Sequence, residues 1–493
     1  MHEIIPLKAS HGIHSASKRQ PDKTAVIFGA RSVSYKELTS NMRKVSYAAF
    51  TNMPFQGNIA ILAQNSVEYL EVLLGAADVG VPVATMNPKS TVREVTAALK
   101  DCKAKVLFVD EKLFREVYKD TVDLVITFGE KYIQWRDKHE EISRYPFIAD
   151  STIFSIVYSS GTTGEPKGIK HSHRLKTMIS YTMALDYNCM REEDVMLALA
   201  SLSNGGGCGT ALACLNNGGT LVLGSQVHPE YMMRMIEQHR VTCAFIVPTL
   251  LHVILNTESC HKYDKSSLKA IFSSAAPFDR PLKKKAIEFF GNILYDVYAS
   301  TECGPVSVLK PKDFEHGLCS VGVPVSGCTI EVRREDGLLA GVGEAGEVFA
   351  KTLTLYSGYV KNDLNTHTNL KEVDSEFVSA GDLGYIGWDG FLYLIGRKSD
   401  MIITAGNNVH PEEVEGVLNG CPGVIESAVV GEQDDKWGEI VTAYIVGVPK
   451  VDPVEYCRKY LGNYKIPRKV VYVDSIPKSE IGKILRKKLR KQL

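Results

Sequence analysis

The sequence predicts an α/β protein: a large N-terminal domain of mainly parallel sheets with helices and a β-rich subdomain, followed by a small α+β C-terminal domain. Short apolar runs rich in β-branched residues recur, as in NIAILA, KVLFVD and TLVLG, and such runs indicate buried strands. Segments with apolar residues at helical spacing, such as SVEYLEVLLGAADVG, lie between several of them. This alternation is typical of parallel sheets covered by helices. The length of 493 residues exceeds what one core covers, so several structural units are expected.

In chain order, strands are expected at residues 24–28, 58–63, 105–110, 123–128, 220–224, 243–248, 270–277 and 293–300, with helices at 66–80 and 280–291. Ligands of such sheets bind beyond the carboxyl ends of the strands. Two polar loops follow apolar runs there: residues 158–168 come after STIFSIV, and residues 298–304 come after NILYDV. These two loops are the first candidates for a binding site.

The residue pattern of the sequence changes after about Val321, where Gly-rich strand and turn segments such as GEAGEVFAK begin. This change predicts a smaller β-rich subdomain over about residues 321–398. From Gly396 onward, strand, turn and helix patterns continue to the last residues of the chain. We therefore place a domain boundary near Ser399, with an N-terminal domain over 1–398 and a C-terminal domain over 399–493.

Composition and charge exclude several classes of function. The 57 basic side chains balance 57 acidic ones, which argues against nucleic acid as a partner, and the basic run ILRKKLRKQL is interpreted as a solvated helix face. The N-terminus lacks the apolar core of a signal peptide, and the eleven cysteines contain no C-x-x-C pair, so a cytoplasmic location and no structural metal are expected. The uncharged stretch 195–228 holds too many glycines and asparagines for a membrane-spanning helix. It predicts instead a buried helix and strand beside a pocket.

The loop YSSGTTGEPKG, residues 158–168, has the composition of a polyphosphate site. Its hydroxyl groups can donate hydrogen bonds, its glycines let backbone N–H groups approach a ligand, and Lys167 adds a positive charge. An ordinary surface turn would use the same residue types. The loop is not a Walker P-loop, because a proline precedes Lys167 and a glycine follows it. Magnesium would therefore need another ligand, for which Glu302, beside the hydroxyl of Thr301 in YASTECG, is the candidate.

The loop YSSGTTGEPKGI closely resembles the signature loop of the adenylate-forming superfamily, which contains acyl-CoA synthetases, nonribosomal peptide adenylation domains and beetle luciferases. Further segments match motifs of this superfamily in the expected order, and together they cover nearly the whole chain: SYKEL, SSAAP at 273–277, YASTE at 298–302, GEAGEVFAK, SAGDLG at 379–384, GRKSDMI at 396–402, GNNVHPEEVE at 406–415 and PKSEIGKILRKKL at 477–489. This resemblance makes an ordinary surface turn a poor interpretation of the loop.

The resemblance implies a two-step ligase reaction at one site. A carboxylate attacks the α-phosphate of ATP to give acyl-AMP and pyrophosphate, and a thiol then displaces AMP to give a thioester. ATP, Mg²⁺ and coenzyme A are the implied cofactor and co-substrates. Thr301, Glu302 and Lys483 would be catalytic, with Thr301 on the α-phosphate and Glu302 on the metal. The implied contacts to ATP or AMP are Ser160, Gly161, Thr162, Thr163, Gly164, Lys167, Ala275, Ala276, Pro277, Asp296, Tyr298, Asp382 and Arg397.

Within that set, the resemblance implies a different role for each part of the nucleotide site. The loop residues would grip the β- and γ-phosphates that leave as pyrophosphate. Tyr298 would stack on adenine, while Asp296 and the backbone at 275–277 would define the edge of the base. Asp382 would accept hydrogen bonds from the ribose hydroxyls, with Arg397 in support, because one carboxylate can accept two such bonds at once.

The same resemblance implies a mobile C-terminal domain. This domain would present Lys483 to the carboxylate and the α-phosphate during adenylation, and would then rotate about a hinge at Ser399. The rotation would bring Gly406 toward the site to line a tunnel for the pantetheine of coenzyme A. Members of the superfamily usually carry Asp or Lys at the hinge, so the serine departs from the family pattern.

The choice of acid rests on the stretch LASLSNGGGCG. It contains no acidic residue that would hold an amine, which disfavours an amino-acid substrate. The expected acyl pocket is formed by Asn204, Gly205, Gly206 and Gly207, with Ala299 in place of a common glycine. Small residues there favour a medium- or long-chain fatty acid, with an aryl or other carboxylate as the alternative.

The acceptor thiol is a separate question. A standalone chain favours coenzyme A over the phosphopantetheine of a carrier protein. A non-catalytic acyl- or nucleotide-binding relative would be a different class of protein. The joint presence of Thr301, Glu302, Asp382, Arg397 and Lys483 argues against that class. A monomer and a homodimer are both compatible with the sequence.

Overall fold

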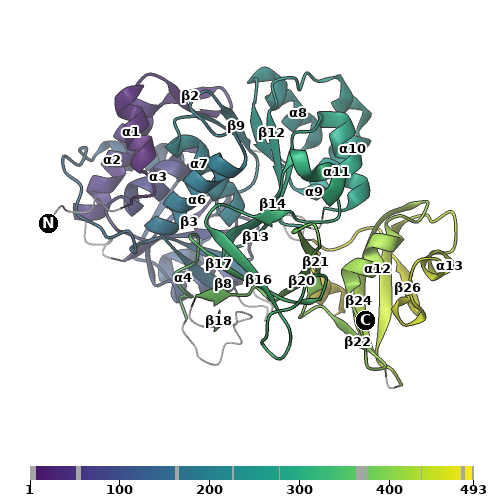
Figure 1. Cartoon of the computed structure of the whole chain (residues 1–493). Coiled ribbons are helices and arrows are strands. Elements are labelled where there is room, and N and C mark those ends of the chain that lie inside the picture. The colour runs from purple at the N-terminus through teal and green to yellow at the C-terminus, as the bar shows by residue number, and fades with distance from the viewer. Residues whose placement is uncertain are drawn as a thin grey trace.

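Four β-sheets organise the chain, which runs from the purple N-terminus to the yellow C-terminal lobe in Figure 1. The computed structural model describes residues 7–51, 57–160, 166–224, 227–276, 278–361, 372–373, 376–434, 436–478 and 484–490, without the side chains of residues 159–160, 166 and 372–373. Two of the sheets are mainly parallel. These two carry both polar loops that the sequence analysis identifies as candidates.

The first of these sheets has six strands in the order β6-β5-β3-β4-β7-β8. Neighbouring strands pair in parallel as far as β7, and β7 and β8 form an antiparallel hairpin around the glycine-rich loop. The loop therefore follows the carboxyl end of β7, where ligands of parallel sheets bind. The strands are β3 Asn58–Leu62, β4 Val83–Met86, β5 Ala104–Val109, β6 Leu124–Thr127, β7 Ile153–Ser160 and β8 Pro166–Ser172.

The second sheet has nine strands in the order β15-β14-β13-β12-β11-β9-β10-β1-β2. Its central strands, from β1 to β13, pair in parallel, and β2, β14 and β15 add antiparallel edges. The turn between β13 and β14 contains Thr301 and Glu302. The strands are β1 Thr24–Phe28, β2 Arg31–Ser34, β9 Val195–Ala198, β10 Thr220–Leu223, β11 Cys243–Phe245, β12 Ala270–Ser273, β13 Leu294–Ser300, β14 Gly304–Leu309 and β15 Val323–Pro324.

Helices cover both faces of these sheets. One hydrophobic cluster joins side chains of both sheets with α3, α6 and α7, so these helices lie between the sheets. Alternate strand residues point to the opposite faces, where α8, α9 and α10 pack on the nine-stranded sheet and α4 packs on the six-stranded one. The helices are α1 His11–Arg19, α2 Tyr35–Thr51, α3 Val67–Ala77, α4 Val92–Asp101, α5 Glu130–Asp137, α6 His173–Asp186, α7 Gly205–Asn216, α8 Pro229–Gln238, α9 Pro248–Asn256, α10 Arg280–Phe290 and α11 Phe314–Gly317.

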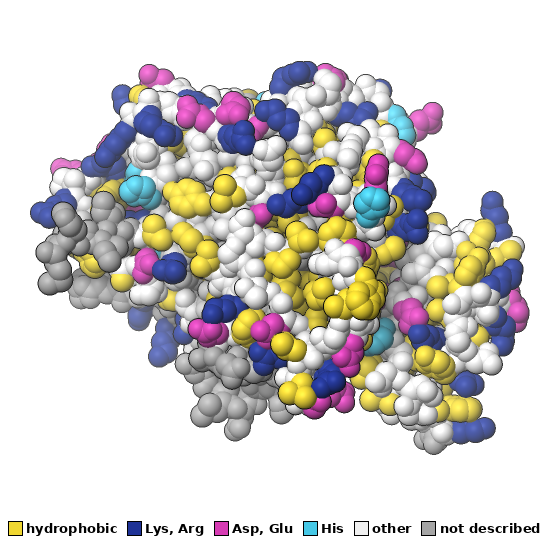
Figure 2. All heavy atoms as spheres, viewed as in Figure 1, with side chains coloured by type: hydrophobic (Ala, Val, Ile, Leu, Met, Phe, Trp, Pro, Cys, Tyr) yellow, Lys and Arg dark blue, Asp and Glu magenta, His cyan; other side chains and the backbone are white. Residues whose placement is uncertain are grey.

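The described part of the uncharged stretch 195–228 contains the buried helix and the strand that the sequence predicts. It forms β9, the buried helix α7 and β10. Among the residues that the structure describes, no helix has the length and apolar character needed to cross a membrane. Figure 2 shows basic and acidic side chains interspersed on the face that it displays, in keeping with the balanced charge of the sequence.

The third sheet is antiparallel and contains six strands: β16 Cys328–Arg333, β17 Gly346–Thr352, β18 Glu372–Val373, β19 Phe377–Val378, β20 Asp382–Ile386 and β21 Leu392–Arg397. It lies within the β-rich segment that the sequence predicts. β20 and β21 pair so that Asp382 and Arg397 are direct neighbours across the two strands. The two residues expected to hold ribose are therefore placed together by strand register.

The fourth sheet belongs to a small C-terminal lobe, drawn in yellow-green and yellow in Figure 1. The lobe has its own hydrophobic core, in which α12 packs against β24 and β25. Its elements are β22 Ile402–Thr404, β23 Asn407–Val409, α12 Pro411–Leu418, β24 Val424–Asp434, β25 Gly438–Gly447, α13 Pro453–Arg458, β26 Lys469–Tyr472 and α14 Arg486–Arg490. The predicted fold class is thus confirmed.

Candidate active site

A hydrogen-bonded chain of three side chains links the nine-stranded sheet to the third sheet. The hydroxyl of Tyr298, at the end of β13, donates to Asp382 Oδ2 at 2.7 Å. Arg397 Nε lies 3.1 Å from Asp382 Oδ1. Burial, followed by the charge of Asp382, raises the pKa of Tyr298, so its hydroxyl stays protonated as a donor. Since a carboxylate has about four acceptor positions, Asp382 retains capacity for the two hydroxyls of a ribose.

The turn that carries Thr301 and Glu302 lies between β13 and β14. Glu302 Oε1 accepts a hydrogen bond from the hydroxyl of Tyr359 at 3.1 Å, and the backbone carbonyl of Glu302 accepts one from Tyr356 N at 2.7 Å. The carbonyl of Thr301 accepts a hydrogen bond from His171 Nε2 at 2.8 Å. The turn is therefore held from two sides, by the segment around 356–359 and by strand β8.

The acceptor positions that remain on the Glu302 carboxylate fit a magnesium ion. This carboxylate has acceptor positions beyond the one that Tyr359 occupies. Among the described residues, no group of three or more His, Cys, Asp or Glu side chains could hold a metal alone. Magnesium commonly takes one or two carboxylates together with phosphate oxygens. Glu302 therefore fits a cation that arrives with a nucleotide.

The phosphate loop is described only at its base. Strands β7 and β8 pair from Ile153 to Ser160, and Lys167 lies opposite Ser159 in this hairpin. Gly161, Thr162, Thr163, Gly164 and the side chain of Ser160 lie outside the described residues. A bridge between Ile169 and Tyr359 connects β8 to the segment that contacts Glu302. The base of the loop and the Glu302 turn thus share one supporting segment.

The backbone after β12 has an unusual conformation. Ala275 has a φ of 77°, in the left-handed region that residues with a Cβ rarely adopt. Ala275 and Ala276 are partly exposed, and Pro277 lies outside the described residues. Such conformations cluster at ligand-binding sites, which fits the predicted position of this backbone beside adenine.

Asp296 lies in the interior and is already paired. Its Oδ2 atom is 2.7 Å from Lys283 Nζ, and that ammonium also donates to the carbonyls of Leu318 and Ser320 at 3.0 Å each. Burial raises the pKa of Asp296, while the nearby Lys283 opposes the shift. The contact between Asp296 and adenine stays a prediction, and it would require the carboxylate to share its bond with Lys283.

The predicted acyl-pocket residues divide into two kinds. A methyl group added to Gly207 would lie 2.2 Å from the carbonyl oxygen of Ser201, so glycine is required there by backbone packing. Gly205 has no atom within 4 Å of such a methyl group, and Gly206 would only touch Phe245 at 3.4 Å. These two glycines, with Asn204 at the N-cap of α7 and the exposed Ala299, border open space.

The predicted hinge and tunnel residues lie at the edge of the small lobe. Ser399 falls between β21 and β22, and Gly406 falls in the tight turn between β22 and β23. Gly406 has a φ of 78° and no atom within 4 Å of an added methyl group, so its backbone conformation favours glycine and its surroundings are open. Lys483 lies outside the described residues.

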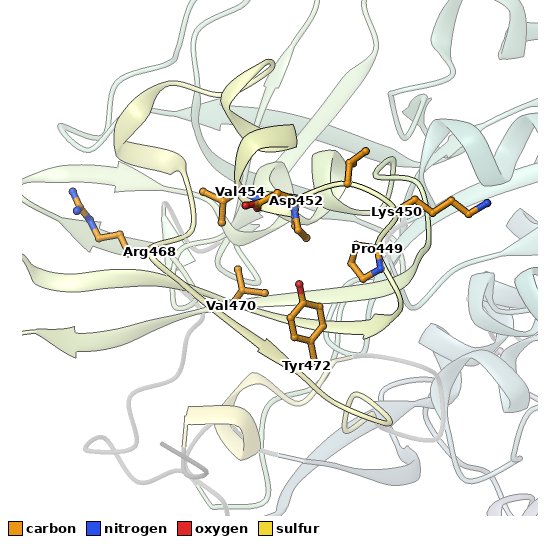
Figure 3. A pocket seen from close by; sticks show the side chains of 9 residues that line it. Pro449, Lys450, Asp452, Val454, Arg468, Val470 and Tyr472 are labelled. Carbon is orange, nitrogen blue, oxygen red and sulfur yellow. The ribbon is translucent and has the colours of Figure 1, made fainter.

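A separate groove lies on the small lobe, between the segment 449–454 and strand β26 with the residue before it, as Figure 3 shows. Its volume is about 600 Å³, and it is lined by Pro449–Val454, Arg468, Val470 and Tyr472. None of the predicted site residues lines this groove. The candidate active site is therefore the region around Tyr298, Asp382 and Glu302.

Sequence reasoning missed three residues of this region: His171, Tyr356 and Tyr359. Each contacts the Thr301–Glu302 turn from a distant part of the chain. Tyr356 and Tyr359 lie in TLYSGYV, just after the β-rich motif GEAGEVFAK. Two tyrosines around a glycine in a loop were the only available signal.

Comparison with known proteins identifies the family. The model of the AMP-binding enzyme family matches residues 13–360, and the model of the AMP-binding enzyme C-terminal domain matches residues 413–483. Similar curated proteins include the fatty acid–[acyl-carrier-protein] ligase ScoC of Streptomyces coeruleorubidus, 28% identical over 491 residues that cover 96% of this chain and 94% of that protein. The 2-succinylbenzoate–CoA ligase of Bacillus subtilis is 29% identical over 476 residues, which cover 95% of each protein.

Solved structures of similar fold agree with this family assignment. The o-succinylbenzoate CoA synthetase MenE from Bacillus subtilis, in complex with the acyl-adenylate intermediate OSB-AMP, matches with a TM-score of 0.87 and 27% identity over 97% of each chain. ATP-bound MatB from Rhodopseudomonas palustris matches with a TM-score of 0.90 over 98% of this chain and 99% of that one, at 24% identity, which supports the fold. The chain belongs to the AMP-binding enzyme family, and its predicted resemblance to the adenylate-forming superfamily is confirmed.

Proposed function

We propose that this protein is an ATP-dependent acid–thiol ligase. It activates a carboxylic acid as acyl-AMP, with release of pyrophosphate, and transfers the acyl group to coenzyme A. The observation that carries this proposal is the hydrogen-bonded chain from Tyr298 through Asp382 to Arg397. It gathers three residues, far apart in the sequence, that the family resemblance assigns to one nucleotide. The similarity to ligases that act on acids and CoA supports the same reaction.

The first step brings two anions together, so the protein must position them and offset their repulsion. Asp382 and Arg397 would orient the ribose, with Tyr298 against the base. The hydroxyl of Thr301 would contact the α-phosphate, and Lys167 would supply positive charge at the phosphate loop. The role of each residue rests on its motif position together with its place around the site.

Glu302 would hold magnesium together with phosphate oxygens. The metal would supply positive charge to the phosphates during displacement of pyrophosphate. The hydroxyl of Tyr359 and the amide of Tyr356 hold the side chain and the backbone of Glu302, respectively. These two contacts would keep the carboxylate facing the phosphate site before ATP arrives.

The acid is best assigned as a medium- or long-chain fatty acid. Gly205, Gly206 and Ala299 border open space with little side-chain bulk, which suits an alkyl chain. A curated relative is a fatty acid ligase, while others are named as 2-succinylbenzoate ligases. An aryl carboxylate is therefore the alternative to test.

Coenzyme A is the proposed acceptor, and the small C-terminal domain, over 399–493, is proposed to rotate between the two steps. In the first step the rotation places Lys483 at the site, and in the second it places Gly406 there. The open surroundings of Gly406 leave room for a pantetheine chain to pass its backbone. The relative that loads a carrier protein makes such a protein the alternative acceptor.

Pyrophosphate release tests the proposal. The enzyme is incubated with ATP, magnesium and a panel of acids that contains octanoate, palmitate, benzoate and a dicarboxylate. Release with the two fatty acids supports the assignment, and release with benzoate alone replaces it with an aryl substrate. The reaction is then repeated with coenzyme A and with a phosphopantetheinylated carrier protein, and the thioester is detected by mass. No release with any acid would leave the protein as a nucleotide- or acyl-binding relative.

A further inference from the structure

A buried histidine connects the phosphate-loop hairpin to the Thr301–Glu302 turn. His171 lies near the end of β8, four residues after Lys167, and only 2% of it is exposed. Its Nε2 atom is 2.8 Å from the carbonyl oxygen of Thr301. A carbonyl oxygen only accepts hydrogen bonds, so Nε2 carries the proton. In a neutral ring the other nitrogen, Nδ1, is then a bare acceptor.

Two further polar groups lie in the interior near this imidazole. Lys176, in the first part of α6, is fully buried, and Ser155 lies opposite His171 in the register of β7 and β8. Within the described part of the chain, His171 Nδ1, Lys176 Nζ and Ser155 Oγ have no hydrogen-bond partner. Burial, followed by the charge of Lys176, lowers the pKa of His171 well below its ordinary value. The imidazole is therefore neutral.

A buried polar group without a hydrogen-bond partner, such as Lys176 Nζ, destabilises a fold, and an apolar side chain of similar size would avoid that cost. Lys176 therefore needs an explanation other than stability. Its charge reaches His171, and His171 in turn holds the backbone at Thr301. The turn bonded in this way contains the two residues assigned to the α-phosphate and the magnesium ion.

We propose that His171, backed by the charge of Lys176, is a positioning residue that fixes the Thr301–Glu302 turn for adenylation; this inference rests on the proposed function. Strand β8 then serves two parts of the phosphate site. One end of β8 holds Lys167 at the base of the phosphate loop, and the other holds the carbonyl of Thr301. The imidazole thereby sets the distance between the residues for the β- and γ-phosphates and those for the α-phosphate.

His173 provides a matched control, since it is a second buried histidine two residues along the chain. Its Nδ1 atom accepts from Ala9 N at 3.1 Å, and its Nε2 atom donates to the carbonyl of Ala77 at 3.0 Å. Burial lowers the pKa of His173 to about 4. Its contacts tie α6 to the N-terminal segment and the end of α3, away from the Thr301–Glu302 turn.

The test compares His171→Leu, His171→Gln and His173→Leu. We expect His171→Leu to lower the kcat of acyl-AMP formation by about 10- to 100-fold, because the carbonyl of Thr301 loses its donor. The KM for the acid should change by less than about 2-fold. His171→Gln retains an N–H near the position of Nε2 and should recover most of the rate. His173→Leu should lower the Tm without changing kcat per folded enzyme.

Lys176→Met should change Tm and kcat in opposite directions, which a purely structural role of Lys176 would not give. Removing the buried, unpartnered Nζ group should raise the Tm, while kcat should fall by about 3- to 10-fold because Lys176 no longer helps to keep the imidazole neutral. A kcat unchanged in both His171 variants, or changed only in proportion to folded protein, overturns the inference. An unchanged kcat in Lys176→Met would show that Lys176 has no part in the positioning role of His171.

Binding of magnesium and ATP is measured on the same proteins by the shift in Tm. If the wild-type enzyme binds ATP but makes no acyl-AMP, the proposed function fails and the inference is judged on binding alone. Weaker ATP binding in His171→Leu, recovered in His171→Gln, then supports a positioning role. Equal ATP binding in the wild type, His171→Leu and His171→Gln then overturns the positioning role.

Discussion

Two carboxylate networks on either side of Ser399, the proposed hinge, differ in how their negative charge is balanced. In the large domain, the single carboxylate of Asp382 faces the hydroxyl of Tyr298 and the guanidinium of Arg397. One negative charge therefore meets one positive charge and one neutral donor. The carboxylate stands at the junction of two sheets with acceptor capacity left over for a ligand.

In the small domain, three carboxylates share one guanidinium. Arg486 binds both oxygens of Glu415 through Nη2, at 2.8 and 2.7 Å, and it lies 3.1 Å from Glu412 and 3.4 Å from Asp400. Glu412 Oε2 has no hydrogen-bond partner within the described residues. Burial raises the pKa of Glu415 to about 7, with the charge of Glu412 as a further cause and Arg486 opposing both.

The difference teaches where each network can act. The Asp382 network is balanced, and it belongs to the proposed nucleotide site, where it would suit a contact that persists through both steps of the proposed reaction. The Arg486 cluster lies within the small domain, with Arg486 and Glu415 buried, and its three carboxylates outnumber its one guanidinium. We therefore expect the Arg486 cluster to affect the stability of the small domain and the dependence of that stability on pH.

The largest expected effect separates the small domain's role from that of the large one. Lys483→Ala should lower acyl-AMP formation by at least about 100-fold, because a charged donor to the reacting oxygens is lost. Thioester formation from supplied acyl-AMP and coenzyme A should be largely retained, since the proposed rotation would move Lys483 away for that step. Both rates are measured on one preparation by pyrophosphate release and by thioester mass. Equal loss of both steps would contradict a domain that changes role between them.

A smaller effect should fall on both steps at once. Asp382→Asn removes the charge that pairs with Arg397 and weakens the acceptor for ribose, so kcat/KM for ATP should fall by about 10- to 100-fold. Thioester formation from acyl-AMP should fall as well, because the same ribose is bound. Asp389→Asn, on the exposed turn between β20 and β21, is the control and should keep the wild-type rates. If Asp382→Asn lowers only the rate of acyl-AMP formation, Asp382 does not bind the nucleotide through both steps, and the proposed difference from the Arg486 cluster fails.

Much of the fold could be predicted from the sequence because the information is local, whereas the nucleotide contacts of the site residues stay predictions. Apolar runs with β-branched residues marked most of the parallel strands. The order of short motifs predicted Tyr298, Asp382 and Arg397, and strand register then placed the last two side by side. These residues lie within contiguous motifs, and each motif largely determines its own strand or turn.

The contacts that were missed depend on packing between distant segments. His171 and Thr301 are 130 residues apart, and a histidine in KHSHR does not indicate which of its neighbours turns inward toward the site. The run KKK at 283–285 likewise does not reveal that Lys283 is buried against Asp296. Gly207 looked like an open position in the sequence, but the carbonyl of Ser201 lies too close for any side chain.

The smallest effect tests the unbalanced network through pH. Burial raises the pKa of Glu415 from 4.5 to about 7 in the folded protein, so the folded state binds more protons than the unfolded chain between these values. The stability that protonated Glu415 supports is therefore fully present below about pH 4.5 and is lost as the pH rises to about 7. Glu415→Gln should flatten this slope.

The measurement follows the small domain itself, because a chain with several cores does not unfold in one step. Protection of β24 from hydrogen exchange is read across a urea series at pH 5, 6, 7 and 8; the amide of Val429 in this strand donates to Glu415 Oε1 at 2.7 Å. Glu413→Gln, which removes an exposed carboxylate of α12 that pairs with Lys465, should keep the wild-type slope. If Glu415→Gln also keeps that slope, Arg486 holds Glu415 ionised throughout, and the small-domain cluster is as well balanced as the Asp382 network.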